Sequence, residues 1–173
     1  MHNEASPGHH FQVTIAREQG ELPLYRRAGG FSAYNEGWAL YAERVADELA
    51  VYEKDPFGRI GYLQSYLFRA VRLVVDTGLH HKRWSREQAI RYMVENAAEP
   101  EGSALREIEC YSVWPGQACA YKVGQTVIAG LRDEAEQRMG PRFDIKAFHD
   151  ALLLGGSMPL TVLQRRVREW MAA

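Results

Sequence analysis

Residues 36–50 read EGWALYAERVADELA, a run that is rich in strong helix formers and contains no proline. The run lies inside a helix that we predict from about Ser32 to about Tyr52. The segments on either side are of the same kind, and no stretch shows the strict alternation of apolar and polar residues that marks a strand. These observations predict an all-α fold.

Start and stop signals place further helices on both sides of this run. Ser6–Pro7, an N-cap residue followed by proline at the first helical position, predicts a first helix that ends near Gln19. Asp55–Pro56 predicts a third helix, which ends near Gly78. Five more follow: one from the capping box at 85–88, one from Ser103 to about Tyr111, one from Pro115 to Gly140, one from Asp144 to Gly155, and one from Pro159 onward. We therefore expect residues 1–173 to form a single all-α domain of about eight helices.

Composition excludes several classes of function. The chain has 173 residues, of which 46% are hydrophobic and 25% are charged, as in a globular domain. Its 21 Lys and Arg residues nearly balance its 22 Asp and Glu residues, so no basic field favours nucleic acid. The longest apolar runs are far below the roughly 20 residues that span a bilayer, and the opening MHNEASPGHH lacks the apolar stretch of a signal peptide. We expect no nucleic-acid partner and no membrane span, and the localisation is unknown.

The densest chemistry lies at the start of the chain, in HNEASPGHHFQ at residues 2–12. It holds the histidines His2, His9 and His10 and the carboxylate Glu4, the residue types that bind zinc and activate its water. The spacing is longer than in the helical H-E-x-x-H pattern, so a turn that leads into a helix would have to present these groups. The alternative is a surface histidine cluster.

A second motif, NEGWAL at residues 35–40, lies on the next predicted helix. Glu36 follows His9 by 27 positions, and packing of the two helices against each other would bring it beside the histidines. Glu43 lies seven positions further on, on the same helix face, where it could orient a ligand. The alternative is that both carboxylates are solvated.

A polar stripe runs along the otherwise apolar third helix. Arg69, Arg72, Asp76 and His80 follow one another at spacings of three, four and four, which places them on one face. We expect an Arg72–Asp76 ion pair, with Arg69 and His80 left for a substrate. The alternative is an exposed, ion-paired surface.

Two tyrosines flank a loop further along the chain. Tyr111 and Tyr121 lie on either side of WPGQ at residues 114–117, and a tyrosine hydroxyl can donate to an oxyanion that develops beside a metal. The alternative for both is ordinary packing.

Taken together, these segments resemble a known family. The matching stretches are EASPGHHFQ, YNEGWALYAERVADELAVY, RAVRLVVDTGLHHKRWSREQAIRYM, WPGQACAYKVGQ and FDIKAFHDALLLGGSMPLTVL, which cover residues 4 to 163. They resemble the bacterial domain-of-unknown-function 885 family, distant relatives of helical zinc peptidases. The resemblance implies an all-α, zinc-dependent hydrolase of peptides or related amides.

The resemblance also implies roles for individual residues. Glu4 matches the family's general base, His9 a zinc ligand, and Glu36 the third ligand. The family pattern has histidine directly before that first glutamate, whereas this chain has Asn3 there and His2 one position earlier. The first ligand would then come from His2, with Asn3 or His10 as alternatives for that place.

The leading hypothesis is a zinc peptidase or amidase. His2, His9 and Glu36 would hold zinc, and Glu4 would move the proton. Tyr111 or Tyr121 would stabilise the oxyanion, and Arg72 and His80 would bind the substrate.

The competing hypothesis is a non-catalytic helical piece or binding module that keeps the fold without a complete metal site. Family members are far longer than this chain. We therefore expect the C-terminal part of a longer metallohydrolase-like protein, which would dock onto an N-terminal portion or associate with itself.

Overall fold

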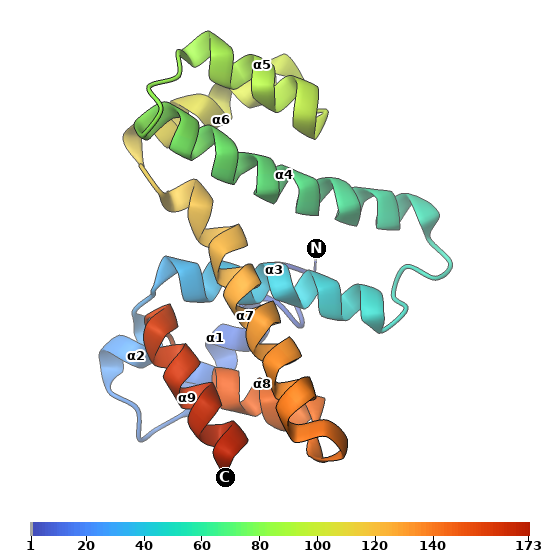
Figure 1. Ribbon diagram of the computed structural model, residues 1–173, viewed down its shortest axis with the longest axis vertical. Coiled ribbons are helices and arrows are strands. Elements are labelled where there is room, and N and C mark those ends of the chain that lie inside the picture. The colour runs from blue at the N-terminus through green and yellow to red at the C-terminus, as the bar shows by residue number, and fades with distance from the viewer. Residues whose placement is uncertain (1) are drawn as a thin grey trace.

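The computed structural model of the protein describes residues 2–173, and this part of the chain is helical, without strands. The helices, which Figure 1 shows in chain order, are α1 (His9–Glu18), α2 (Leu24–Ala28), α3 (Ser32–Glu48), α4 (Pro56–His80), α5 (Arg86–Ala97), α6 (Glu101–Val113), α7 (Gln117–Met139), the 3₁₀ turn η1 (Gly140–Arg142), α8 (Ile145–Leu153) and α9 (Leu160–Ala172). The predicted all-α fold is confirmed. None of the described helices combines the length and the apolar character needed to cross a membrane.

Three of the predicted helix starts are built from side-chain caps. The Asp55 carboxylate accepts a hydrogen bond from the backbone N–H of Gly58 at 2.9 Å, at the start of α4. Ser85 caps α5 and Asp144 caps α8 in the same way. Each cap satisfies an N–H group that has no partner within its own helix, which is why these starts can be recognised in the sequence.

Other boundaries differ from the prediction. The helix α1 begins at His9 rather than at Ser6–Pro7, because residues 2–8 form turns whose carbonyl groups accept from the first amides of α1. The helix α6 begins at Glu101, ahead of the predicted Ser103. The short helix α2 was not predicted, since five residues contain no full apolar repeat.

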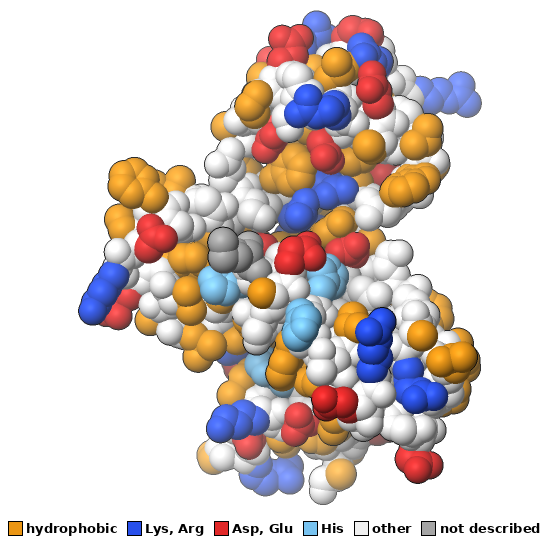
Figure 2. All heavy atoms as spheres, turned by 180° about the vertical axis from the view of Figure 1, so that it is seen from behind, with side chains coloured by type: hydrophobic (Ala, Val, Ile, Leu, Met, Phe, Trp, Pro, Cys, Tyr) orange, Lys and Arg blue, Asp and Glu red, His pale blue; other side chains and the backbone are white. Residues whose placement is uncertain are grey.

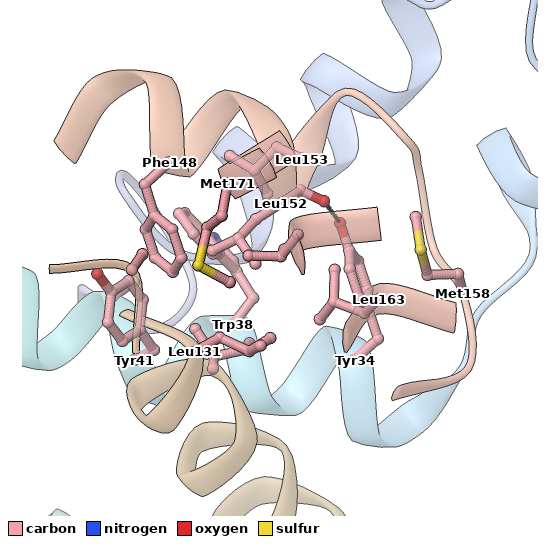
Figure 3. Close-up of a cluster of buried hydrophobic side chains, with 14 residues drawn as sticks. Tyr34, Trp38, Tyr41, Leu131, Phe148, Leu152, Leu153, Met158, Leu163 and Met171 are labelled. Atoms are coloured by element: carbon pink, nitrogen blue, oxygen red, sulfur yellow. Dashed lines mark hydrogen bonds between the residues drawn. The ribbon is translucent and has the colours of Figure 1, made fainter. Parts of the chain in front are cut away.

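The helices enclose two hydrophobic cores, and α7 contributes to both. Figure 1 shows α7 running from the group of α4, α5 and α6 to the group of α8 and α9. The larger core lies among α3, α7, α8 and α9, and Figure 3 shows its side chains, including the hydrogen bond that the Tyr34 hydroxyl donates to the Leu152 carbonyl at 2.9 Å. The smaller core lies among α4, α5, α6 and the start of α7. The α3–α4 hairpin and α7 therefore connect two packed units.

The helices α3 and α7 cross at two glycines. A Cβ atom added to Gly37 would lie 2.5 Å from the backbone of Gly124, and one added to Gly124 would collide with the backbone carbonyl of Ala33. Only glycine allows two helix backbones to approach this closely, and the contact is made of backbone atoms that cannot move aside.

This crossing generates a stability prediction. Gly124→Ala should lower the free energy of unfolding by about 1–3 kcal/mol, because overpacking outweighs the gain in helix propensity. Gly130→Ala on the same helix is the matched control, since nothing lies within 4 Å of its added Cβ, and it should raise the free energy of unfolding by up to about 1 kcal/mol. Urea unfolding measures both; equal stability of the two variants would contradict the close crossing.

Candidate metal centre

The N-terminal turn is locked onto α3. The backbone N–H of His9 donates to the Asn3 carbonyl at 2.8 Å, and that of His10 donates to the Glu4 carbonyl at 2.9 Å. The indole N–H of Trp38 on α3 donates to the Pro7 carbonyl at 2.9 Å. Gly8 is required at its position because any Cβ there would collide with the Asn3 carbonyl. The start of α1 is thereby held at a fixed place beside α3.

This arrangement brings His9 and Glu36 together. The Nε2 atom of His9 lies 3.2 Å from Oε2 of Glu36, and both side chains are largely buried, at 24% and 21% exposed. Two nitrogen or oxygen ligands of a tetrahedral zinc lie about 3.3 Å apart, because each metal–ligand bond is about 2.0–2.2 Å long. The observed spacing therefore suits two ligands of one metal ion.

Two amide side chains flank this pair, and we did not predict either of them. The Gln12 amide donates to Oδ1 of Asn35 at 3.4 Å, and Gln12 Oε1 is buried without a hydrogen-bond partner. The signal in the sequence was positional: Gln12 follows His9 by three residues, and Asn35 directly precedes Glu36. The amides fix the facing sides of α1 and α3 around the pair.

The electrostatics favour a positive charge on His9. The hydrogen bond to Glu36 raises the pKa of His9 above its ordinary value, with further contributions from the charges of Glu36 and Glu4, while burial opposes the shift. Glu4 is exposed, and its charge contributes to the raised pKa of His9. The pair is thus a cation site that a proton can occupy.

The predicted first ligand lies elsewhere. The His2 ring packs edge-on against the Tyr52 ring, with centroids 5.7 Å apart, and His10 is exposed on α1. Asn3 is 6% exposed, and its amide nitrogen has no partner. In residues 2–173 no three His, Cys, Asp or Glu side chains are grouped so that they could hold a metal ion. The structure brings two of the three predicted ligands together.

The other predicted residues form a separate cluster around Arg72. The imidazole of His80 lies 2.8 Å from the Tyr111 carbonyl through Nε2, and the Tyr111 hydroxyl donates to Glu107 at 2.7 Å. Burial raises the pKa of Tyr111 well above its ordinary value, so its hydroxyl keeps its proton. The Arg72 guanidinium lies over the Tyr121 ring, 4.6 Å from the centroid.

The predicted Arg72–Asp76 ion pair is wrong. Arg72 instead donates through Nη2 to Oε1 of Gln117 at 3.2 Å. Both carboxylate oxygens of Asp76 accept from the backbone N–H of Gly116, at 3.0 and 3.1 Å, in the turn that leads into α7. The backbone donor competes successfully because the turn places it directly over the carboxylate.

Glu43 lies between the two groups of residues. It is 7% exposed, and one of its carboxylate oxygens, Oε2, has no hydrogen-bond partner. Burial raises the pKa of Glu43, while the charges of Arg69 and His2 oppose the shift. Glu43 is therefore buried and not a solvated carboxylate, and its expected role in orienting a ligand stays a prediction.

The His9–Glu36 contact predicts a pH dependence. A raised pKa in the folded state means that the pair stabilises the fold below the ordinary histidine pKa of about 6.5, and that this stabilisation is lost as the pH rises through the pKa of His9. Glu36→Gln should therefore destabilise the protein more at about pH 5.5 than at about pH 9.

The same pKa can be followed directly by NMR titration of the imidazole. Glu36→Gln should lower the pKa of His9, and Glu4→Gln should lower it less, because Glu4 contributes only through its charge. His149 is the internal control: burial lowers its pKa to about 4, and neither variant touches it. An unchanged His9 titration in Glu36→Gln would refute the contact.

Comparisons with known proteins agree with this fold. Residues 1–167 match the family described as "Bacterial protein of unknown function (DUF885)". No curated protein matches the sequence. Among solved structures, the chain is similar to a "putative lipoprotein" from Colwellia psychrerythraea, with 55% identity and a TM-score of 0.96, over 99% of this chain and 29% of that one.

A second structure, a "putative lipoprotein of unknown function" from Shewanella oneidensis, shares 30% identity with a TM-score of 0.85, over 98% of this chain and 30% of that one. The chain thus spans less than a third of the length of these two relatives. The match over residues 1–167 nevertheless includes the N-terminal turn, the His9–Glu36 pair and the Arg72 cluster. This chain belongs to the bacterial DUF885 family, whose function is unknown.

Proposed function

We propose that this protein is a metal-dependent hydrolase of peptide or amide bonds, with His9 and Glu36 as ligands of a zinc ion. One observation carries the proposal: an imidazole nitrogen and a carboxylate oxygen from two helices, 27 residues apart, lie 3.2 Å from each other. That spacing suits neighbouring ligands of tetrahedral zinc, and both ligand types are ones that zinc prefers. The ordered turn before α1 supports it, because it holds His9 in place.

The residues present fit a metal in part. His9 and Glu36 supply two ligands. The sequence pattern offers His2, the Asn3 side chain or His10 for the first place, of which His2 packs against Tyr52 and His10 is exposed on α1. Asn3 is buried in the turn that leads into α1, where its backbone carbonyl accepts from the N–H of His9. The oxygen of its side-chain amide can ligate a metal ion, whereas the nitrogen cannot. A bound zinc supplies a water of lowered pKa and polarises a carbonyl group.

Side chains of this protein then transfer the proton, bind the substrate and stabilise the oxyanion. Glu4 is exposed, near enough to act on the charge of His9, and unpaired by any described ion pair, so it is the group to take a proton from water and return it to the leaving amine. Arg72 binds the substrate. Tyr121, whose ring lies beside Arg72, takes the place of oxyanion donor ahead of Tyr111, since the hydroxyl of Tyr111 already donates to Glu107.

A second function has its own supporting observation. Only two of the three predicted ligands lie together in residues 2–173, which is what a binding module that had lost its metal would show. The two functions differ in one measurable property, because only the hydrolase requires that His9 and Glu36 bind zinc.

Zinc binding tests the proposal directly. The protein should bind one zinc ion in calorimetric titration at about pH 7.5, and His9→Ala or Glu36→Ala should weaken binding by more than about 100-fold, since losing a ligand costs more than losing a group that merely orients one. His81→Ala and Glu18→Ala are matched controls, because both side chains are exposed and outside the site. Equal affinity in wild type and Glu36→Ala would support the binding module instead.

Hydrolysis separates the role of Glu4 from that of the ligands. Glu4→Gln should reduce kcat on small peptide amides by about 100-fold or more and leave zinc affinity unchanged, because it removes the proton acceptor and keeps the ligands. Glu18→Gln is the control, an exposed carboxylate on α1. Full activity in Glu4→Gln would assign the proton transfer to another group.

A further inference from the structure

We propose that Arg69 and Arg72 form a binding site for the terminal carboxylate of a peptide. The inference rests on the proposed function and narrows its substrate class to peptides with a free C-terminus. It is carried by two arginines of α4 that share one aromatic ring and lack a carboxylate partner.

The surroundings of Arg72 favour the binding of an anion. It is 7% exposed, and its guanidinium lies within 5.5 Å of the ring centroids of Tyr121, Tyr111 and Phe68. It donates one hydrogen bond, from Nη2 to Gln117, while its buried Nε has no partner. A buried guanidinium with free donors is costly unless an oxyanion accepts from it.

Arg69 brings a second positive charge to the same ring. Its guanidinium lies 4.4 Å from the Tyr121 centroid, and its Nε is also buried without a partner. Neither arginine forms an ion pair with any residue of the described chain. Two like charges held on one aromatic ring favour the binding of an anion between them.

The neighbouring carboxylates leave room for a singly charged ligand. Asp76 accepts from the Gly116 amide and Glu107 accepts from the Tyr111 hydroxyl, so both are engaged elsewhere. Glu43 is the carboxylate on which the charge of Arg69 acts. Burial raises the pKa of Glu43, which makes its ionised form less favourable. These three acidic groups, and Glu99 in the hollow beside Arg69, suit a carboxylate better than a doubly charged phosphate, which they would repel more strongly.

The site is accessible from the surface of α4. A hollow of about 350 Å³ lies beside Arg69, lined by Ser65, Phe68 and, on the other side, Glu99. Figure 2 shows Lys and Arg side chains where the molecule narrows between its upper and lower parts, with Asp, Glu and His side chains directly below them. A ligand can therefore reach Arg69 from this hollow, and Arg72, which is buried, lies one helical turn further along α4.

The helix α3 gives a scale for a peptide that would reach from the arginines to the His9–Glu36 pair. Glu43, which acts on Arg69, lies seven residues after Glu36 on α3, a rise of about 10 Å. An extended chain covers about 3.5 Å per residue, so this span corresponds to about three residues. A peptide held by its terminal carboxylate would present an amide bond near its C-terminus to the pair.

Binding of acetyl-trialanine to the zinc-free protein tests the inference. The free acid should bind at least about tenfold more tightly than its C-terminal amide, measured by NMR titration, because only the acid accepts charge-assisted hydrogen bonds. Arg69→Gln, which alters a partly exposed side chain, should abolish this preference, and so should Arg72→Gln if circular dichroism shows it folded. Arg59→Gln on the same helix, which removes an exposed arginine paired with Asp47, should keep it.

Further measurements in the same experiment distinguish this site from the proposed metal site. His9→Ala should retain the preference for the acid, so loss of zinc binding and loss of carboxylate binding are independent results. Equal binding of acid and amide, or an acid preference that survives Arg69→Gln, would overturn the inference. Inorganic phosphate that binds more tightly than the acid and depends on Arg69 would also overturn it, in favour of a phosphate site.

Discussion

The backbone contact between Gly37 and Gly124 is the constraint on which the rest of the structure depends. Glu36 directly precedes the first of these glycines, and Tyr121 lies three residues before the second. The crossing of α3 and α7 therefore sets the position of a candidate metal ligand and of the ring that carries both arginines. It also joins the two hydrophobic cores, because α3 packs in the larger one and α7 in both.

Charge placement follows from this crossing. Beside α1, the pair of His9 and Glu36 binds a proton more tightly than a free histidine does, and a metal ion would compete with that proton for the same nitrogen. Beside α4, Arg69 and Arg72 lie without carboxylate partners. The proposed zinc hydrolase of peptides with a charged end would require both a cation site, here the His9–Glu36 pair, and an anion site, here the two arginines of α4.

The sequence predicted what local chemistry determines. Asp55, Ser85 and Asp144 mark helix starts because each caps its own helix, and the 27-residue separation of His9 and Glu36 suits two packed helices joined by a short connection, here α1 and α3. Contacts made by tertiary structure were not predictable. Asp76 is bound by a backbone amide of a distant turn, and His80 lies against a backbone carbonyl, neither of which leaves a mark in residue type or spacing. The edge-on packing of the His2 ring likewise depends on where Tyr52 lies after α3 ends.

The proposed function depends on whether a metal ion lies between His9 and Glu36. Anomalous diffraction at the zinc absorption edge, from crystals of the protein grown with zinc, measures this most directly. If both residues ligate zinc, we expect an anomalous peak about 2.0–2.2 Å from both His9 Nε2 and Glu36 Oε2. Zinc peaks elsewhere on the molecule with none at this pair, under conditions where His9 is neutral, would contradict it.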